Sequence, residues 1–239
     1  MSLRERHARA VTDFIATCHR LAQVGYVASE GGNCSWRLAD DLILISPTRM
    51  PKGAMTPDDV VFIDAAGKVI EGAHRPSGEA PIHLACFAAR PDLRSVVHCH
   101  PPATCAIAIT AGQNWLARPL FPEVIIEIGP VPLVPYAVPL SQDLVECFAP
   151  YLLRYNSFLM QNHGLLSATD GDLGQTMMRV ELLECAANSI AMAMAMGGIH
   201  ELDRKAVGDL EQVMRMRQLP LPGLPGRNRS LIDLYFPTV

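Results

Sequence analysis

The hydrophobic pattern along the chain predicts alternating helices and strands. Apolar residues recur at helical spacing from residue 3 to residue 24, and Gly25 then provides a natural helix C-cap. Short apolar runs typical of strands follow, and the two patterns alternate irregularly after that. Helices are expected over 3–24, 78–90, 103–111, 141–151 and 172–196, and strands over 42–45, 60–63, 69–70, 95–100, 124–128, 131–136 and 158–161.

These elements indicate one α/β domain with a mixed sheet covered by helices. The chain shows no repeat of fixed period and no internal linker. The proline-rich stretch 219–225 has too little chain after it to join another domain. We therefore expect one domain over 1–218 and a C-terminal tail over 219–239 that packs on this domain or on a neighbouring subunit.

Composition narrows the class of protein. Of the 239 residues, 49% are apolar and 18% are charged, and the net charge is −4. This balance is typical of a globular protein and gives no footprint for nucleic acid or an anionic membrane surface. Apolar runs fall short of the roughly 20 residues that cross a bilayer, and the charged N-terminus precedes no signal-peptide core. A cytoplasmic protein without membrane or nucleic-acid partners is predicted.

The cysteines argue against two kinds of site. The seven cysteines are an odd number, scattered along the chain without CxxC spacing. That pattern disfavours a disulfide framework and a thiolate zinc site. Any bound metal would therefore need histidine and carboxylate ligands.

The stretch VVHCHPP is the first candidate for such ligands. On a strand, His98 and His100 point to one side of the sheet and Cys99 to the other. Pro101 ends the strand, which places both imidazoles at the edge of the sheet, where a ligand can reach them. The alternative is that both rings only hydrogen-bond backbone groups, as isolated HxH pairs often do.

A third histidine favours the metal interpretation. His163 directly follows another short apolar strand, and Gly164 behind it leaves room for close approach. Three histidines at strand ends would supply the protein ligands of a catalytic zinc or a similar ion, with one position open. A capping role for His163 is the alternative.

A carboxylate should stand near an open metal site that does chemistry. Glu79 is the best candidate, because it opens a helix just before the HxH strand. A first-turn glutamate is also favoured by the helix dipole alone. His83, one helical turn further on, is a possible fourth ligand or a partly buried helix histidine.

Five short motifs give the chain a family resemblance. They are GGNCS at 31–35, ISPT at 45–48, PSGE at 76–79, HCHP at 98–101 and QNHG at 161–164. In this order they resemble the class II aldolase/adducin family, in the branch of fuculose-1-phosphate aldolase and related sugar-phosphate aldolases. The resemblance implies a three-layer α/β domain with a mainly antiparallel sheet.

The resemblance also implies a chemistry. His98, His100 and His163 would bind a divalent ion, zinc first and manganese as the alternative, and Glu79 would be the acid/base beside it. The ion would stabilise the enediolate left when a small ketose 1-phosphate is cleaved to dihydroxyacetone phosphate and an aldehyde. A homotetramer around a fourfold axis, with active sites at subunit interfaces, is implied as well.

The implied phosphate pocket departs from the family pattern at two positions. Arg49 stands where glycine is usual, and Gly78 stands where a second serine is usual. Either Arg49 or Lys52 supplies charge for a phosphate, or the bound anion is a carboxylate; the alternative, favoured for Lys52, is that the side chain points to solvent. The substrate-binding candidates are Gly32, Asn33, Thr48, Arg49, Ser77 and Gly78.

A further departure lies in LFPEV, residues 120–124. The sugar-phosphate aldolases carry a proton-donating tyrosine in this region, but here it offers only Phe121 and Glu123. Glu123 is either a substitute acid or a solvated loop glutamate.

Four functions follow from these residues. A metal-dependent aldolase is favoured over a metal-dependent decarboxylase of a hydroxylated sugar or aromatic acid, which Arg49 and Gly78 would suit. An epimerase or dehydratase has no special support. A non-enzymatic scaffold like the head domain of adducin is disfavoured, because the three histidines and Glu79 are all present.

Overall fold

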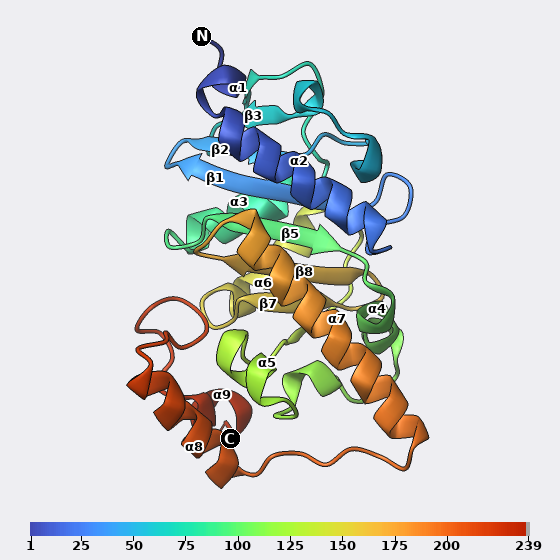
Figure 1. Cartoon of the computed structure of the whole chain (residues 1–239), viewed down its shortest axis with the longest axis vertical. Helices are drawn as coiled ribbons and strands as arrows, with labels where there is room; N and C mark the ends of the chain where they lie inside the picture. Colours follow the sequence, from blue (N-terminus) through green and yellow to red (C-terminus); the bar gives the residue numbers. More distant parts are fainter. Residues whose placement is uncertain (238–239) are drawn as a thin grey trace.

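The computed structural model describes residues 1–237, and a central sheet runs through the molecule (Figure 1). Within residues 1–237, eight strands pair in the order β4-β3-β2-β1-β5-β8-β7-β6, and β6 with β7 is the one parallel pair. The strands are β1 (Asn33–Ala39), β2 (Leu42–Ile45), β3 (Val61–Ile63), β4 (Val69–Glu71), β5 (Ser95–Cys99), β6 (Leu133–Val134), β7 (Ser157–Met160) and β8 (Gly164–Thr169).

Helices cover both faces of this sheet, which confirms the predicted three-layer α/β fold. Helices α2 (Ala8–Gln23), α4 (Pro102–Ile109) and α7 (Leu173–Ala195) pack on one face. Helices α3 (Ala80–Ala89) and α6 (Gln142–Leu152) pack on the other. Strand β5 is buried throughout and serves both layers: Val97 and Cys99 belong to the core under α2 and α7, and Val96 to the core under α3 and α6.

Two predicted elements differ from the structure. The expected strand at 124–128 is the helix α5 (Pro122–Glu127), because Pro122 occupies a first-turn position that suits proline. The expected helix over 3–24 is divided at His7 into α1 (Leu3–Arg6) and α2. Four elements were not anticipated: the strands β1 and β8, and the helices α8 (Arg204–Met216) and α9 (Leu231–Tyr235).

The C-terminal segment forms a small third core against α5. Leu231 and Leu234 from α9 are buried with Val207 and Met214 of α8 and with Ile125. The segment expected as a tail, 219–239, thus follows α8 in the chain and packs back against it through α9. This holds for residues 219–237; residues 238–239 lie outside the described chain.

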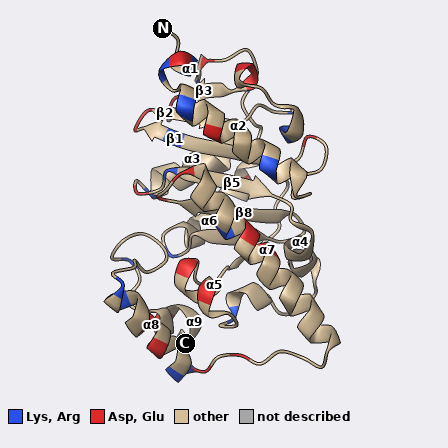
Figure 2. Cartoon of the chain, in the orientation of Figure 1, with Lys and Arg blue, Asp and Glu red and all other residues tan. Residues whose placement is uncertain are grey.

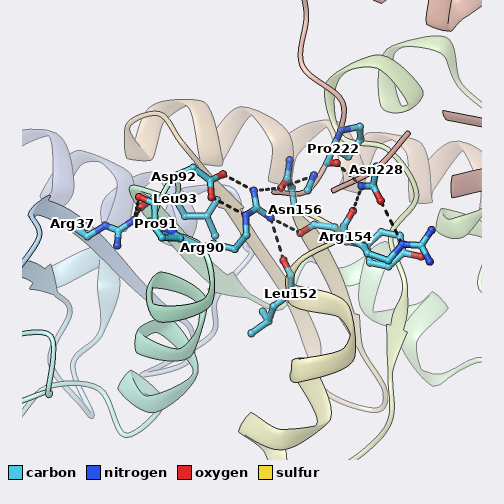
Figure 3. Close-up of polar contacts among 12 residues, drawn as sticks. Arg37, Arg90, Pro91, Asp92, Leu93, Leu152, Arg154, Asn156, Pro222 and Asn228 are labelled. Atoms are coloured by element: carbon cyan, nitrogen blue, oxygen red, sulfur yellow. Dashed lines mark hydrogen bonds and ion pairs between the residues drawn. The ribbon is translucent and has the colours of Figure 1, made fainter. Parts of the chain in front are cut away.

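Arg90 links this segment to the sheet (Figure 3). Arg90 is 1% exposed, and its guanidinium donates to both carboxylate oxygens of Asp92, at 2.9 and 2.7 Å, and to the carbonyl of Leu152 at 3.1 Å. It also donates to Asn156 Oδ1 at 3.1 Å, which in turn accepts from the backbone N–H of Gly223 at 3.2 Å. The C-terminal segment is therefore held by the same polar cluster that connects α3 to β5.

Charged residues lie mostly on helices and loops, with both signs interspersed, and the central strands carry few of them (Figure 2). Among the described residues, no helix combines the length and apolar character that a membrane span needs.

The Arg90 cluster leads to a prediction about stability. Arg90→Met should lower the free energy of unfolding by about 3 kcal/mol, because it leaves buried carbonyls and an aspartate without their donor. Arg94→Met, the same change at an exposed arginine close by, is the matched control and should cost less than about 0.5 kcal/mol. Urea unfolding curves with unchanged slope would measure both; equal midpoints for the two variants would contradict the prediction.

Candidate metal centre

Three histidines converge where β5 ends and β8 begins. His98 is on β5, His100 directly follows it, and His163 ends the turn between β7 and β8. One ring nitrogen from each lies within 4.8 Å of the others, and the Nε2 atoms of His98 and His100 are 3.1 Å apart. The structure thus brings together the three residues that the sequence singled out.

His98 is oriented by the strand beside it. Its Nδ1–H donates to the carbonyl oxygen of Leu165 at 3.0 Å, which leaves the Nε2 lone pair directed at the other two rings. Burial lowers the pKa of His98 to about 4, and burial also lowers the pKa of His100. Both rings are therefore neutral near pH 7, the form in which imidazole binds a metal ion.

Glycines make this approach possible. A Cβ atom on Gly164 would lie 2.6 Å from both the Cδ2 of His100 and the carbonyl oxygen of Cys99. A Cβ on Gly31 would lie 3.3 Å from the Nδ1 of His100. At Gly164 no other residue fits without moving backbone or the ring.

Glu79 faces the histidines from the start of α3. Its Oε2 lies 3.4 Å from the Nε2 of His98, and its Oε1 lies 3.6 Å from the Nε2 of His163. The side-chain amide of Asn33 donates to Oε2 at 2.7 Å. Burial raises the pKa of Glu79, but His98, the Asn33 hydrogen bond and His163 together outweigh it and leave this pKa below its ordinary value.

The donor set fits a divalent cation. Three imidazoles meet beside an ionised carboxylate, and among the described residues the buried Oε1 of Glu79 has no hydrogen-bond partner. Three histidine ligands with an open position suit zinc and related ions. His83 is not part of this set, because both of its ring nitrogens are hydrogen-bonded elsewhere, to Ser35 and Asn33.

Two distant motifs run side by side next to Glu79. The backbone N–H of Ser77 donates to the carbonyl of Ser46, and that of Thr48 donates to the carbonyl of Arg75. The hydroxyl of Ser77 is turned inward and accepts from the N–H of Glu79 at 3.2 Å. The segments 45–48 and 76–79 therefore form one wall leading to the carboxylate.

The substrate-binding candidates are divided between this wall and its outer edge. Thr48, Arg49 and Gly78 are exposed, and Arg49 adopts a left-handed φ of 52°, a backbone conformation that glycine adopts without strain. Leu140 lies over Gly78, since a Cβ there would be 3.0 Å from its Cδ2. Gly32, Asn33 and Ser77 are instead buried around His98 and Glu79.

Lys52 does not point to solvent, contrary to the favoured expectation. It is 1% exposed, and its ammonium donates to the carbonyl oxygens of Met50 at 2.8 Å and Glu30 at 3.3 Å. Burial lowers its pKa. Lys52 therefore stabilises the loop that carries Gly31, and its ammonium group is directed at these backbone carbonyls.

Glu184 is a supporting residue that the sequence analysis missed. Glu184 is 5% exposed. Its carboxylate accepts from the backbone N–H groups of Ala103 and Thr104, both at 2.8 Å. It thereby caps α4 directly after His100. A lone glutamate inside the apolar run LLECAA was the only signal for this role.

With a sheet-edge centre of three histidines and a glutamate established, comparison with known proteins defines the family. The profile of the Class II Aldolase and Adducin N-terminal domain matches residues 12–190. The chain belongs to this class II aldolase/adducin family.

The relatives of this chain differ from one another in activity. A 5-methylthioribulose-1-phosphate/5-deoxyribulose-1-phosphate aldolase of Escherichia coli O45:K1 is 30% identical over 88% of this chain and 94% of its own length. A 3-oxo-tetronate 4-phosphate decarboxylase of Escherichia coli O6:H1 is 33% identical over 68% of this chain and 74% of its own. The crystal structure of Escherichia coli YgbL superposes with a TM-score of 0.78 at 27% identity, over 84% of this chain and 96% of that one.

The close approach at Gly164 can be tested by metal binding. Gly164→Ala should weaken zinc binding about 10- to 100-fold, because the added methyl group displaces the ring of His100. Gly208→Ala is the matched control, since its Cβ would meet only the Cδ1 of Ile232, at 4.0 Å. Isothermal titration with zinc measures both affinities; wild-type affinity in Gly164→Ala would show that His100 does not depend on this contact.

Proposed function

We propose that the protein is a divalent-metal-dependent lyase that cleaves a small ketose 1-phosphate to dihydroxyacetone phosphate and an aldehyde. The observation that carries this proposal is the ionised carboxylate of Glu79 set against three histidines, with its Oε1 buried and, among the described residues, without a hydrogen-bond partner. A divalent cation on His98, His100 and His163 would polarise the substrate's carbonyl and hydroxyl oxygens and stabilise developing negative charge.

Glu79 is suited to move a proton at the carbon where the bond breaks. In the cleavage, the hydroxyl oxygen on the carbon that becomes the aldehyde gives up its proton to the ionised carboxylate of Glu79, and the electron pair of the broken carbon–carbon bond stays with the three-carbon phosphate fragment. Glu79 then delivers this proton to the carbon of that fragment and is ionised again; in the reverse direction it removes the proton from that carbon. Its Oε1 is the free oxygen for this transfer, since Oε2 already accepts from Asn33.

Decarboxylation is the second candidate, and the 33% identical relative favours it. A 3-oxo-tetronate 4-phosphate that loses its carboxylate as carbon dioxide leaves an electron pair on the same carbon of the same fragment. A proton that Glu79 takes from solvent and delivers to this carbon would again give dihydroxyacetone phosphate. The two reactions differ in the leaving group, so they place different demands on the wall with Thr48, Arg49 and Gly78, and the same demand on Glu79.

The roles of the carboxylate and the histidines are separable. Glu79→Gln should retain about one zinc or manganese per chain and lose turnover about 100-fold or more, whereas His163→Ala should lose the metal itself. Metal content by elemental analysis and turnover by release of dihydroxyacetone phosphate distinguish the two effects. Glu146→Gln, at an exposed position on α6, is the matched control. Full activity in Glu79→Gln would overturn the proposed mechanism.

The reaction itself is tested by two assays. The metal-loaded protein should exchange a hydroxymethyl hydrogen of dihydroxyacetone phosphate with deuterium oxide, because both candidate reactions pass through deprotonation of that carbon in reverse. A panel of ketose 1-phosphates and 3-oxo-tetronate 4-phosphate should then show which substrate releases dihydroxyacetone phosphate. Aldehyde release supports the aldolase, carbon dioxide release supports the decarboxylase, and no exchange with bound metal would contradict both.

A further inference from the structure

A line of buried polar side chains lies behind Glu79, in the layer between the sheet and α3. The hydroxyl of Ser35 is 2.6 Å from the Nδ1 of His83, and the Nε2 of His83 is 2.5 Å from the Oδ1 of Asn33. The Nδ2 of Asn33 is 2.7 Å from the Oε2 of Glu79. Ser35 and His83 are 0% exposed and Asn33 is 4% exposed.

The direction of every hydrogen bond in this line follows from its last member. The carboxylate of Glu79 can only accept, so the Asn33 amide must donate from Nδ2 and present Oδ1 to His83. His83 must therefore donate from Nε2. Because burial lowers the pKa of His83 to about 3, the ring is neutral and its Nδ1 must accept from the hydroxyl of Ser35.

Rigid elements hold the line in place. Asn33 lies directly opposite His98 in the pairing of β1 with β5, and Ser35 is two residues further along β1 on the same face. His83 comes four residues after Glu79, one turn along α3, so both side chains lie on the same side of that helix. The sheet and the helix thus fix the two ends independently.

We propose that Ser35, His83 and Asn33 form a positioning relay that holds Glu79 by its Oε2 and leaves Oε1 as the proton-transferring oxygen. This inference rests on the proposed function, in which Glu79 is the acid/base. In this role the Oδ1 of Asn33 accepts from His83, and one hydrogen of its Nδ2 is donated to Glu79. A swapped Asn33 amide would set its oxygen against the carboxylate, and the Nε2–H of His83 prevents that swap.

The tautomer of His83 is a direct test that needs no substrate. In the zinc-loaded full-length protein with ¹⁵N-labelled histidine, long-range proton–nitrogen correlation spectra should show a neutral His83 protonated at Nε2 and not at Nδ1. The His83→Gln variant identifies the signal by its loss. A ring protonated at Nδ1, or at both nitrogens, would overturn the relay.

Paired substitutions test the effect on Glu79. His83→Gln keeps a donor and an acceptor, whereas His83→Met of similar size has neither. We expect His83→Met to lower the kcat of deuterium exchange into dihydroxyacetone phosphate about 100-fold, with KM and zinc content within about twofold of wild type, and His83→Gln to recover activity to within about tenfold. Equal activities of the two variants would show that His83 only fills space.

The outcomes separate this inference from the proposed function. If Glu79→Gln keeps its activity, the proposed function fails, even where the tautomer is as expected. If Glu79→Gln is inactive but His83→Met exchanges at the wild-type rate, only the relay fails. Should His83→Met not fold, Ser35→Ala replaces it. The relay then requires a shifted Nδ1 resonance of His83, with Nε2 still protonated, and a lower kcat at unchanged zinc content. An unchanged resonance and rate would contradict it.

Discussion

The pairing of β5 with β1 on one side and β8 on the other is the constraint on which the candidate centre depends. It places His98 opposite both Asn33 and Leu166, and it directs His98 and His100 to the same side. A shift of one residue would turn Cys99 towards α3 and both histidines towards α2. Two neighbouring strands oppose such a shift, so the register is determined twice.

Burial gives the centre its electrostatic character. Imidazoles in a dry layer stay neutral, and a carboxylate surrounded by rings and an amide donor stays ionised. Each buried polar group costs free energy unless it is paired, and here the pairing itself determines which atoms stay available. The Nε2 of His98 and the Oε1 of Glu79 face the other histidines, because the second polar atom of each side chain is hydrogen-bonded elsewhere.

The hydrophobic pattern predicted an α/β sheet covered by helices and placed His98 and His100 on one side of it, since these features follow from periodicity; the three-layer, mainly antiparallel arrangement was implied by the family resemblance. It failed where a second signal competed with it. The β-branched run after Pro122 was interpreted as a strand, although the proline starts a helix there. Lys52 was expected in solvent because lysine is seldom buried, and only the fold shows the two carbonyls that bind it. The hydrogen bonds of His83 and Glu184 join residues 50 and 80 apart, which no local pattern can reveal.

Strand β5 also keeps the Arg90 anchor at one of its ends apart from the candidate metal centre at the other. The buried guanidinium of Arg90, which anchors the C-terminal segment, lies near the start of β5 at Ser95. The candidate metal centre lies at the other end of the strand, beyond Cys99. The rise of an extended strand puts these two ends roughly 15 Å apart. Changes of sequence around the wall at Thr48 and Gly78 therefore leave the anchor intact. Such a scaffold can acquire a new substrate by drift at one end of a strand while the other end keeps the chain folded, which suits a family whose members cleave different bonds.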